Sequence, residues 1–409
     1  MIAINNSNLI GSNRFLSFIS TFNLALSLVG YQFVTTIFSG FIGATGESQL
    51  VSIPYRIVTM MCCLIILLLT RQQRIPLSSN LKWFLFFWGL LVFRFILDSS
   101  FGSFDISAEV KSRTWSYMIF MTLIPILAVI RSYEYVDIRK LLYYAFTISA
   151  ITSIYMFFMV DEFQIATEER ISVGNSALGS IAVGRTGLTT VLLSAVLFKY
   201  DKRKMYKIAS AMSLFFGLVI MLRSGSRGPI LSIVTIAVVY FLSLDKSIAY
   251  KLFVIISVLS MTSIIIGIFD DFIQDYSPVL YERLHRDGGQ FYDRELFYTD
   301  ALNNFYKNPI LGYSLGIYKN GNLTYAHNIF LDALMQWGII GACILFGIIG
   351  SLIKKIIYSI RYKLDISWIG LMIVFYLTGL MLSGSIFTTP VFSIITVFFL
   401  CRFKLEAKL

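Results

Sequence analysis

The sequence predicts an all-α polytopic membrane protein with about twelve transmembrane helices and one long loop on the outer face of the membrane. Apolar residues make up 57% of the 409 residues and charged residues only 14%, so a water-soluble globule would have too little polar surface. Apolar runs of about 20 residues recur along the chain, and a helix of that length crosses ~30 Å of hydrocarbon. The alternating pattern of a membrane β-barrel is missing from the sequence.

The apolar runs between charged breaks define the predicted spans in chain order. They cover residues 15 to 43, 55 to 70, 83 to 97, 115 to 130, 141 to 160, 176 to 198, 208 to 222, 229 to 244, 252 to 269, 328 to 351, 366 to 387 and 390 to 401. The first run is long enough to tilt strongly, and the second and twelfth are short. Because the chain starts with polar residues and no small-residue cleavage site follows the first run, we expect this run to stay as the first helix.

Lys and Arg in the connecting segments set the predicted orientation. If the N-terminus is cytoplasmic, the inner segments hold most of the basic residues, whereas most of the acidic residues lie elsewhere. The largest inner cluster consists of Lys199, Lys202, Arg203, Lys204 and Lys207. We therefore expect both termini in the cytoplasm. The net charge of +11 is then mostly a topology signal, and since the bases are scattered over short loops, no nucleic-acid partner is expected.

These spans predict a single membrane domain in three parts. Residues 1–269 would form helices one to nine, residues 270–326 an outer loop with short amphipathic helices, and residues 327–409 helices ten to twelve. A loop as long as 270–326 is usually functional or disordered. Apolar residues recur at helical spacing over residues 291 to 306, which favours an ordered loop.

The first candidate site is the outer-face segment Arg223-Ser-Gly-Ser-Arg-Gly-Pro229, on the side of the membrane where Lys and Arg are disfavoured. Its glycines free the backbone to turn, Ser226 adds a hydroxyl, and Pro229 can open the next helix. Arg223, Arg227 and a helix N-terminus would together suit phosphate oxygens. The alternative is a tight turn whose arginines extend to lipid headgroups, and the residues alone do not separate the two interpretations.

The second candidate site lies in the long loop and just after it. Its candidate basic residues before the chain re-enters the membrane are Arg283, His285, Arg286 and Arg294. His327 stands at the re-entry, where an imidazole that titrates near neutrality could take a proton from a sugar hydroxyl. Asn328 and Asp332 are spaced i, i+4 and share a helix face below it. The alternative is that His327 is only a structural hydrogen bonder, and His285 is the weaker candidate of the two histidines.

Ionisable residues inside the predicted spans are costly in lipid and suggest a use. Arg94 and Asp98 are spaced i, i+4, and we interpret them as a pair that neutralises itself. Arg185 has no sequence-local partner and could face the same cavity as Arg223. The four cysteines fall inside predicted spans, so no thiolate metal site is expected. No phosphate-loop motif, dinucleotide fingerprint or HExxH motif occurs, and the sequence predicts neither metal nor cofactor.

Four motifs together resemble a known family. They are the Arg223-Ser-Gly-Ser-Arg-Gly segment, Asn308-Pro-Ile-Leu-Gly-Tyr-Ser-Leu-Gly, Ala326-His-Asn-Ile-Phe-Leu and Gln336-Trp-Gly-Ile-Ile-Gly. Their order, spacing and placement on one membrane face resemble the bacterial O-antigen polymerase and O-antigen ligase superfamily over roughly residues 180 to 345. The N-terminal half matches only in its helix count.

The resemblance implies a glycosyltransferase on the periplasmic side of the bacterial inner membrane, with an undecaprenyl-diphosphate-linked oligosaccharide as donor and with neither metal nor nucleotide-sugar. His327 matches the family's histidine, which is thought to activate or orient the acceptor hydroxyl. Membrane lipid, a chain-length regulator and a flippase of the same pathway are the implied partners. By similarity, Arg223 and Arg227 would hold the donor diphosphate, and the loop residues Arg283, Arg286 and Arg294 would help. Arg185 is a further candidate because of its position.

Three functions stay open at this point. The leading hypothesis is a polymerase that joins lipid-linked repeat units into O-antigen or a related surface polysaccharide; heavy use of Ile, Phe, Tyr and Asn, as in horizontally exchanged loci, favours it. The ligase that moves finished glycan to lipid A-core uses the same donor and a different acceptor. An exporter of polysaccharide or lipid is the third function, but transporters often have substrate sites near mid-membrane, whereas the unusual polar groups here lie in one outer loop.

Overall fold

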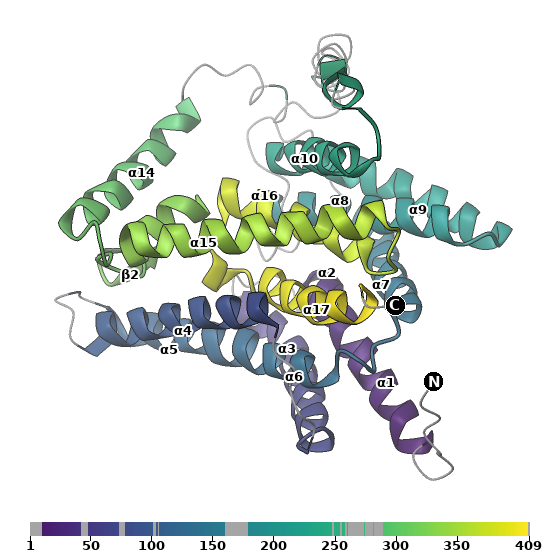
Figure 1. Ribbon diagram of the computed structural model, residues 1–409, viewed down its shortest axis with the longest axis horizontal. Coiled ribbons are helices and arrows are strands. Elements are labelled where there is room, and N and C mark those ends of the chain that lie inside the picture. Colours follow the sequence, from purple (N-terminus) through teal and green to yellow (C-terminus); the bar gives the residue numbers. More distant parts are fainter. Residues whose placement is uncertain are drawn as a thin grey trace. The chain divides into compact units, whose positions relative to one another are not determined.

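The computed structural model describes residues 10–41, 48–72, 78–100, 104, 106–159, 179–247, 249–253, 256, 257, 260, 274, 281 and 289–407. Nearly all of this part of the chain is helical, and one short β-hairpin interrupts the helices, as Figure 1 shows. The chain divides into two compact units. The first comprises residues 1–76, 123–161 and 172–220, and the second residues 77–122, 162–171 and 221–409.

The first unit is a bundle of helices. Its elements are α1 (Ile10–Ala25), the π-helical turn η1 (Leu26–Gly30), α2 (Tyr31–Phe41), α3 (Ser48–Leu69), α6 (Ile124–Ser132), α7 (Ile138–Met159), α8 (Ser180–Tyr200) and most of α9 (Lys204–Arg223). Helix α3 packs against α1, α2 and α6. A buried apolar cluster that includes Ile19, Cys63 and Ala128 joins α1, α3 and α6.

Small and hydroxyl-bearing side chains join helices α7, α8 and α9. This is expected in lipid, where apolar surface gains little from helix association and close packing and hydrogen bonds take over. Thr190 Oγ1 of α8 lies 2.5 Å from Ser149 Oγ and 2.7 Å from Ser153 Oγ of α7, and all three residues are buried. A Cβ added to Gly217 of α9 would stand 2.9 Å from the Gly187 carbonyl oxygen of α8, so these two backbones lie almost in contact.

The second unit contains the remaining described helices and the hairpin. Its elements are α4 (Ser79–Ser100), α5 (Ala108–Trp115), most of the π-helical η2 (Ser116–Leu123), α10 (Arg227–Ser243), α14 (Gly289–Lys307), β1 (Ile317–Lys319), β2 (Asn322–Thr324), α15 (Ile329–Arg361), α16 (Ser367–Ser383), the 3-10 turn η3 (Ile386–Thr388) and α17 (Pro390–Glu406). Helix α10 packs on α15 and α16, and α4 packs on α15 and α17. Trp88 of α4 is fully buried, and its indole N–H donates to Ser393 Oγ of α17 over 3.1 Å.

The hairpin joins α14 to α15. Strands β1 and β2 are antiparallel, with Ile317 opposite Thr324 and Lys319 opposite Asn322. The two-residue turn is Asn-Gly at positive φ, the sequence such turns favour. An ion pair of 2.6 Å between Lys319 Nζ and Asp300 Oδ2 links β1 to α14. The hairpin is therefore fastened beside α14 just before the chain enters α15.

The prediction of an all-α polytopic membrane protein is confirmed. In the described part of the chain, eight helices are long and apolar enough to cross a membrane, and α10 and α16 are shorter apolar helices. Each predicted run coincides with a helical segment except that at 252 to 269, most of which lies outside the described residues. The total of twelve spans stays a prediction. Helix α14 covers the apolar stripe at 291 to 306.

Candidate active site

The turn between α9 and α10 places Arg223 and Arg227 on either side of three buried residues. The hydroxyl of Ser224 donates to Met221 O (2.7 Å) and accepts from the Ser226 N–H (3.3 Å), which closes the end of α9. Ser226 is the extended N-cap of α10, but its side chain makes no capping hydrogen bond. The first N–H groups of α10 are therefore left without a cap from Ser226, as at many anion-binding helix ends.

Arg227 opens α10 with a partly buried guanidinium. Its Nε is buried and forms no hydrogen bond with any residue that the structure describes. Arg294, from the start of α14, is close enough for its positive charge to act on Arg227. None of the described carboxylates forms an ion pair with either arginine. Two cations that repel each other beside a helix N-terminus provide an environment that favours an anion with several oxygens.

His327 occupies the joint between the hairpin and α15, in a left-handed conformation with φ of +57°. Hydrogen bonds on both sides hold this uncommon backbone. Before it, the Ala326 N–H donates to Asp332 Oδ1 (2.9 Å). After it, Asn328 caps α15, and its Oδ1 accepts from the N–H groups of Phe330 (3.0 Å) and Leu331 (3.3 Å). Asn328 and Asp332 thus orient the histidine through the backbone.

The imidazole of His327 is half-buried between aromatic rings. Its centroid lies 4.5 Å from that of Tyr325 and 5.2 Å from that of Phe297 of α14. Burial and the positive charge of Arg294 lower the pKa of His327 below its ordinary value. The ring is therefore neutral at pH 7 and has a nitrogen lone pair that can accept a proton. Within the described chain, no hydrogen bond occupies the imidazole.

Packing of α14 on α15 brings Arg294 to this histidine. A buried cluster of Ala301, Ile317, Ala326 and Met335, with Phe297 packed against it, joins α14, β1 and α15. Arg294 and Phe297 are three residues apart and so lie on the same side of α14. The ring contact between Phe297 and His327 accordingly places the guanidinium on the histidine side of the helix.

Helix α15 is broken about two turns after its start. Trp337 and Gly338 have non-helical backbone angles, and the helix continues beyond them. Residues 308–316 supply partners for the interrupted backbone. Their hydrogen bonds with α15 run from the Ile339 N–H to Pro309 O (2.9 Å), from the Tyr313 N–H to Met335 O (2.8 Å) and from Gln336 Nε2 to Leu315 O (2.8 Å).

Two glycines allow the 308–316 segment to approach α15 this closely. Gly312 and Gly338 both have positive φ, at +72° and +60°. A Cβ on Gly312 would stand 2.3 Å from the Trp337 nitrogen, and one on Gly338 would stand 2.4 Å from Pro309 O. Both sites therefore require glycine, for backbone angle and for space. This interlock explains why the Asn308 motif and the Gln336 motif occur together.

Arg94 and Asp98 lie close enough for their opposite charges to act on each other, as their i, i+4 spacing predicted, but their side-chain hydrogen bonds go to other partners. The Arg94 guanidinium donates to the carbonyl oxygens of Leu311 (2.6 Å), Gly312 (3.1 Å), Tyr313 (3.3 Å) and Gln336 (2.9 Å). Asp98 Oδ2 accepts from the N–H of Leu315 (2.6 Å) and the hydroxyl of Tyr318 (3.0 Å). These partners lie 217 to 242 positions further along the chain, where sequence spacing gives no signal.

The structure brings together part of the predicted site. Arg294 acts electrostatically on both Arg227 and His327, and Arg223 stands at the other end of the turn that opens α10. Sequence reasoning missed Tyr325 as a ring neighbour of the histidine, although it stands two positions before it. The remaining candidates are not placed against this group: Arg185 belongs to the first unit, and Arg283, His285 and Arg286 lie outside the described residues.

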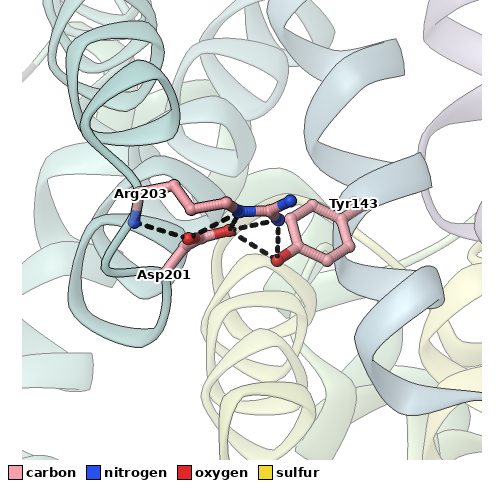
Figure 2. Close-up of polar contacts among 3 residues, drawn as sticks. All are labelled: Tyr143, Asp201 and Arg203. Carbon is pink, nitrogen blue, oxygen red and sulfur yellow. Dashed lines mark hydrogen bonds and ion pairs between the residues drawn. The ribbon is translucent and has the colours of Figure 1, made fainter.

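A second polar cluster belongs to the first unit and serves a different purpose. Figure 2 shows Asp201, after α8, bound to Arg203 before α9 and to Tyr143 of α7. Arg203 Nη2 lies 2.6 Å from Asp201 Oδ2 and donates to the Tyr143 hydroxyl over 2.8 Å. Hydrogen bonds from Arg203 and Tyr143 hold the pKa of Asp201 well below its usual range. The cluster closes the α8–α9 turn against α7, and we interpret it as structural.

Part of the chain matches a known protein family. Residues 212–346 match the Wzy_C family model, which is described as O-antigen ligase. The matched region includes Arg223, Arg227, Arg294 and His327 as well as both interlocking motifs of the 308–316 segment and α15. No curated protein and no solved structure matches the chain.

Proposed function

We propose, from the match of residues 212–346 to the O-antigen ligase family model, that the chain is a polymerase of O-antigen or a related surface polysaccharide. It would join undecaprenyl-diphosphate-linked oligosaccharide repeat units on the periplasmic face of the bacterial inner membrane. The apolar helices and the family match support the coarser statement that the chain is a multi-pass membrane protein with a role in O-antigen processing.

One observation carries the proposal. Arg294 of α14 acts electrostatically on both Arg227 of α10 and His327 of the joint before α15, and no described carboxylate forms an ion pair with either arginine. Keeping like charges together costs free energy unless an anion joins them. A lipid-linked diphosphate supplies that anion, and its sugar would then lie beside the neutral imidazole. Arg223, at the same turn, would add a further donor.

The chemistry follows from these residue types. His327 takes the proton of the acceptor hydroxyl while the acceptor oxygen forms a bond to the anomeric carbon of the donor. The bond between that carbon and the diphosphate oxygen breaks, and its electron pair leaves with undecaprenyl diphosphate. Guanidiniums fixed at a low-dielectric interface stabilise this charge without reorganising. The lowered pKa of His327 suits the role of base because the ring is already deprotonated at pH 7.

The ligase is the second candidate, since the matching family model is described as O-antigen ligase. Its donor would be the same and its acceptor would be lipid A-core. An exporter is less well supported, because the candidate site residues cluster at helix ends and one loop rather than along a path through the membrane. The bias of Lys and Arg supports cytoplasmic termini, and a chain-length regulator and a flippase are the proposed pathway partners.

Deletion of the gene in its host tests the polymerase against the ligase. A polymerase null leaves lipopolysaccharide with a single repeat unit, whereas a ligase null leaves bare core and accumulates lipid-linked polymer. Complementation with Arg223→Ala, Arg227→Ala or His327→Ala should fail to restore long chains at normal protein level. Arg113→Ala is the matched control, because Arg113 is an exposed arginine of α5 in the same unit. Wild-type chain lengths in all three site variants would remove the site from the proposal.

A further inference from the structure

Helix α4 is fastened to both chain segments that lead to His327. Ahead of the histidine, Asp98 binds the Leu315 N–H and the Tyr318 hydroxyl, and Tyr318 belongs to β1, whose partner strand β2 runs directly into residue 325. Behind the histidine, Arg94 binds Gln336 O at the end of the first half of α15. We propose that Arg94 and Asp98 are positioning residues that fix the imidazole of His327 through these two segments.

Arg94 donates hydrogen bonds to backbone carbonyl groups that lipid could not satisfy. It lies in a helix long and apolar enough to span a membrane and is only 8% exposed. Non-helical backbone near a membrane needs protein donors for its carbonyl groups, because hydrocarbon offers none. The guanidinium provides these donors through three nitrogens to four carbonyls, three of them in residues 311–313 and one at the break of α15. The positive charge also suits the C-terminal end of the half-helix that begins after His327.

Two further contacts fix the orientation of this guanidinium. Its central carbon lies 4.6 Å from the centroid of the Trp337 ring, and that ring stacks on Phe93 of α4 with centroids 6.3 Å apart. Lysine has one nitrogen in place of the planar fork, so it cannot reach the same four carbonyls or cover the indole in the same way. Arg94→Lys should therefore behave like a loss of the clamp.

Variants of Asp98 can distinguish a positioning role from a role in which its charge only compensates that of Arg94. Both of its hydrogen bonds end on Oδ2, and it acts only as an acceptor in them. An asparagine oxygen can accept the same two bonds, although it lacks the charge. If Asp98 holds the segment, Asp98→Asn keeps most of the function and Asp98→Ala loses it. If Asp98 merely neutralises Arg94, the two variants are equally damaging, because both leave the arginine charge uncompensated.

The positioning role of Arg94 and Asp98 rests on the proposed function. The experiment that tests it has two readouts. Long-chain glycan is measured in the complemented host, and binding of undecaprenyl diphosphate is measured with the purified protein. Asp98→Ala and Arg94→Lys should lower the yield of long chains by about tenfold or more, since small misplacements of a reacting group are costly. Asp98→Asn should lower it by about threefold at most. Binding of undecaprenyl diphosphate should stay near that of the wild type in all three, because the arginines of the site are untouched.

A local readout keeps the test decisive if Arg94→Lys is poorly expressed. In Asp98→Ala, amide hydrogen exchange should rise in peptides covering residues 308–328 and stay unchanged in α16. Glu109→Ala, at an exposed carboxylate of α5, is the matched control. Equal losses in Asp98→Asn and Asp98→Ala, or full chain length in Asp98→Ala, would overturn the inference. If His327→Ala instead keeps full chain length, the proposed function fails, and the exchange result still reports on the clamp.

Discussion

Replacement of Gly338 by alanine tests the interlock that supports the site. Gly338 is buried at the break of α15, with φ of +60°. With ψ of -155° this backbone conformation is essentially restricted to glycine, and an L-residue in it costs about 1–3 kcal/mol. The new Cβ would also stand 2.4 Å from Pro309 O, and overpacking of this kind costs typically about 1–3 kcal/mol. Together these terms predict a loss of roughly 2–6 kcal/mol, unless residues 308–316 move away from α15.

Gly350 offers a matched control within the same helix. A Cβ added at Gly350 meets nothing within 4 Å, and the position is helical. Gly350→Ala should therefore be neutral or stabilise the protein by about 0.5–1 kcal/mol through helix propensity.

The assay compares both variants in detergent by thermal unfolding, followed by tryptophan fluorescence, and in cells by glycan chain length. Gly338→Ala should unfold at a lower temperature and lose long chains, because the backbone on either side of His327 shifts. Gly350→Ala should match or exceed the wild type in both measurements. If the two variants behave alike, the close approach of the 308–316 segment to α15 is refuted.

Two further predictions concern titrating groups. Transfer needs neutral His327, whose pKa is lowered by burial and by Arg294, so the rate should be constant above neutrality and fall only in acid, below about pH 6.5. Arg294→Gln removes one cause of the lowered pKa of His327. The acid-side fall of the residual rate, measured at saturating donor, should therefore move toward neutral pH. An unchanged pH profile would contradict the electrostatic contact between Arg294 and His327. Asp201 has a lowered pKa in the folded state, so its contribution to stability is present above about pH 4 and is lost as the pH falls through the lowered value. Asp201→Asn should therefore unfold at a lower temperature than the wild type at pH 7, and this difference should narrow in acid. The variant should still make glycan chains of normal length. Shortened chains would show that the cluster is more than structural.

The spanning helices could be predicted because their signal is local. A run of apolar residues long enough to cross the bilayer specifies a helix whatever its neighbours are, and α7 and α8 begin within a few residues of their predicted starts. The break of α15 could not be predicted in the same way. Residues 328 to 351 read as one apolar run, and the reason for the break is a segment that lies far outside it, around Gly312.

The partners of the buried charged residues and of His327 could not be predicted from the sequence either. Spacing of i, i+4 correctly placed Arg94 and Asp98 close together on one helix, but their hydrogen-bond partners belong to a segment 217 or more positions away. For His327 the motif indicated the residue, whereas its left-handed backbone depends on Asp332 and Asn328, which sequence reasoning assigned to a helix face below the histidine. Such contacts follow from tertiary packing, which no local pattern encodes.

Binding of undecaprenyl diphosphate to the purified protein tests the central claim most directly. If Arg227 and Arg294 hold the lipid diphosphate, replacing either by alanine should weaken binding by about tenfold or more, which corresponds to the loss of one charge-assisted contact of about 1.5–3 kcal/mol. His327→Ala should bind nearly as well as the wild type, since the imidazole acts on the acceptor. Unchanged affinity in both arginine variants would contradict the account.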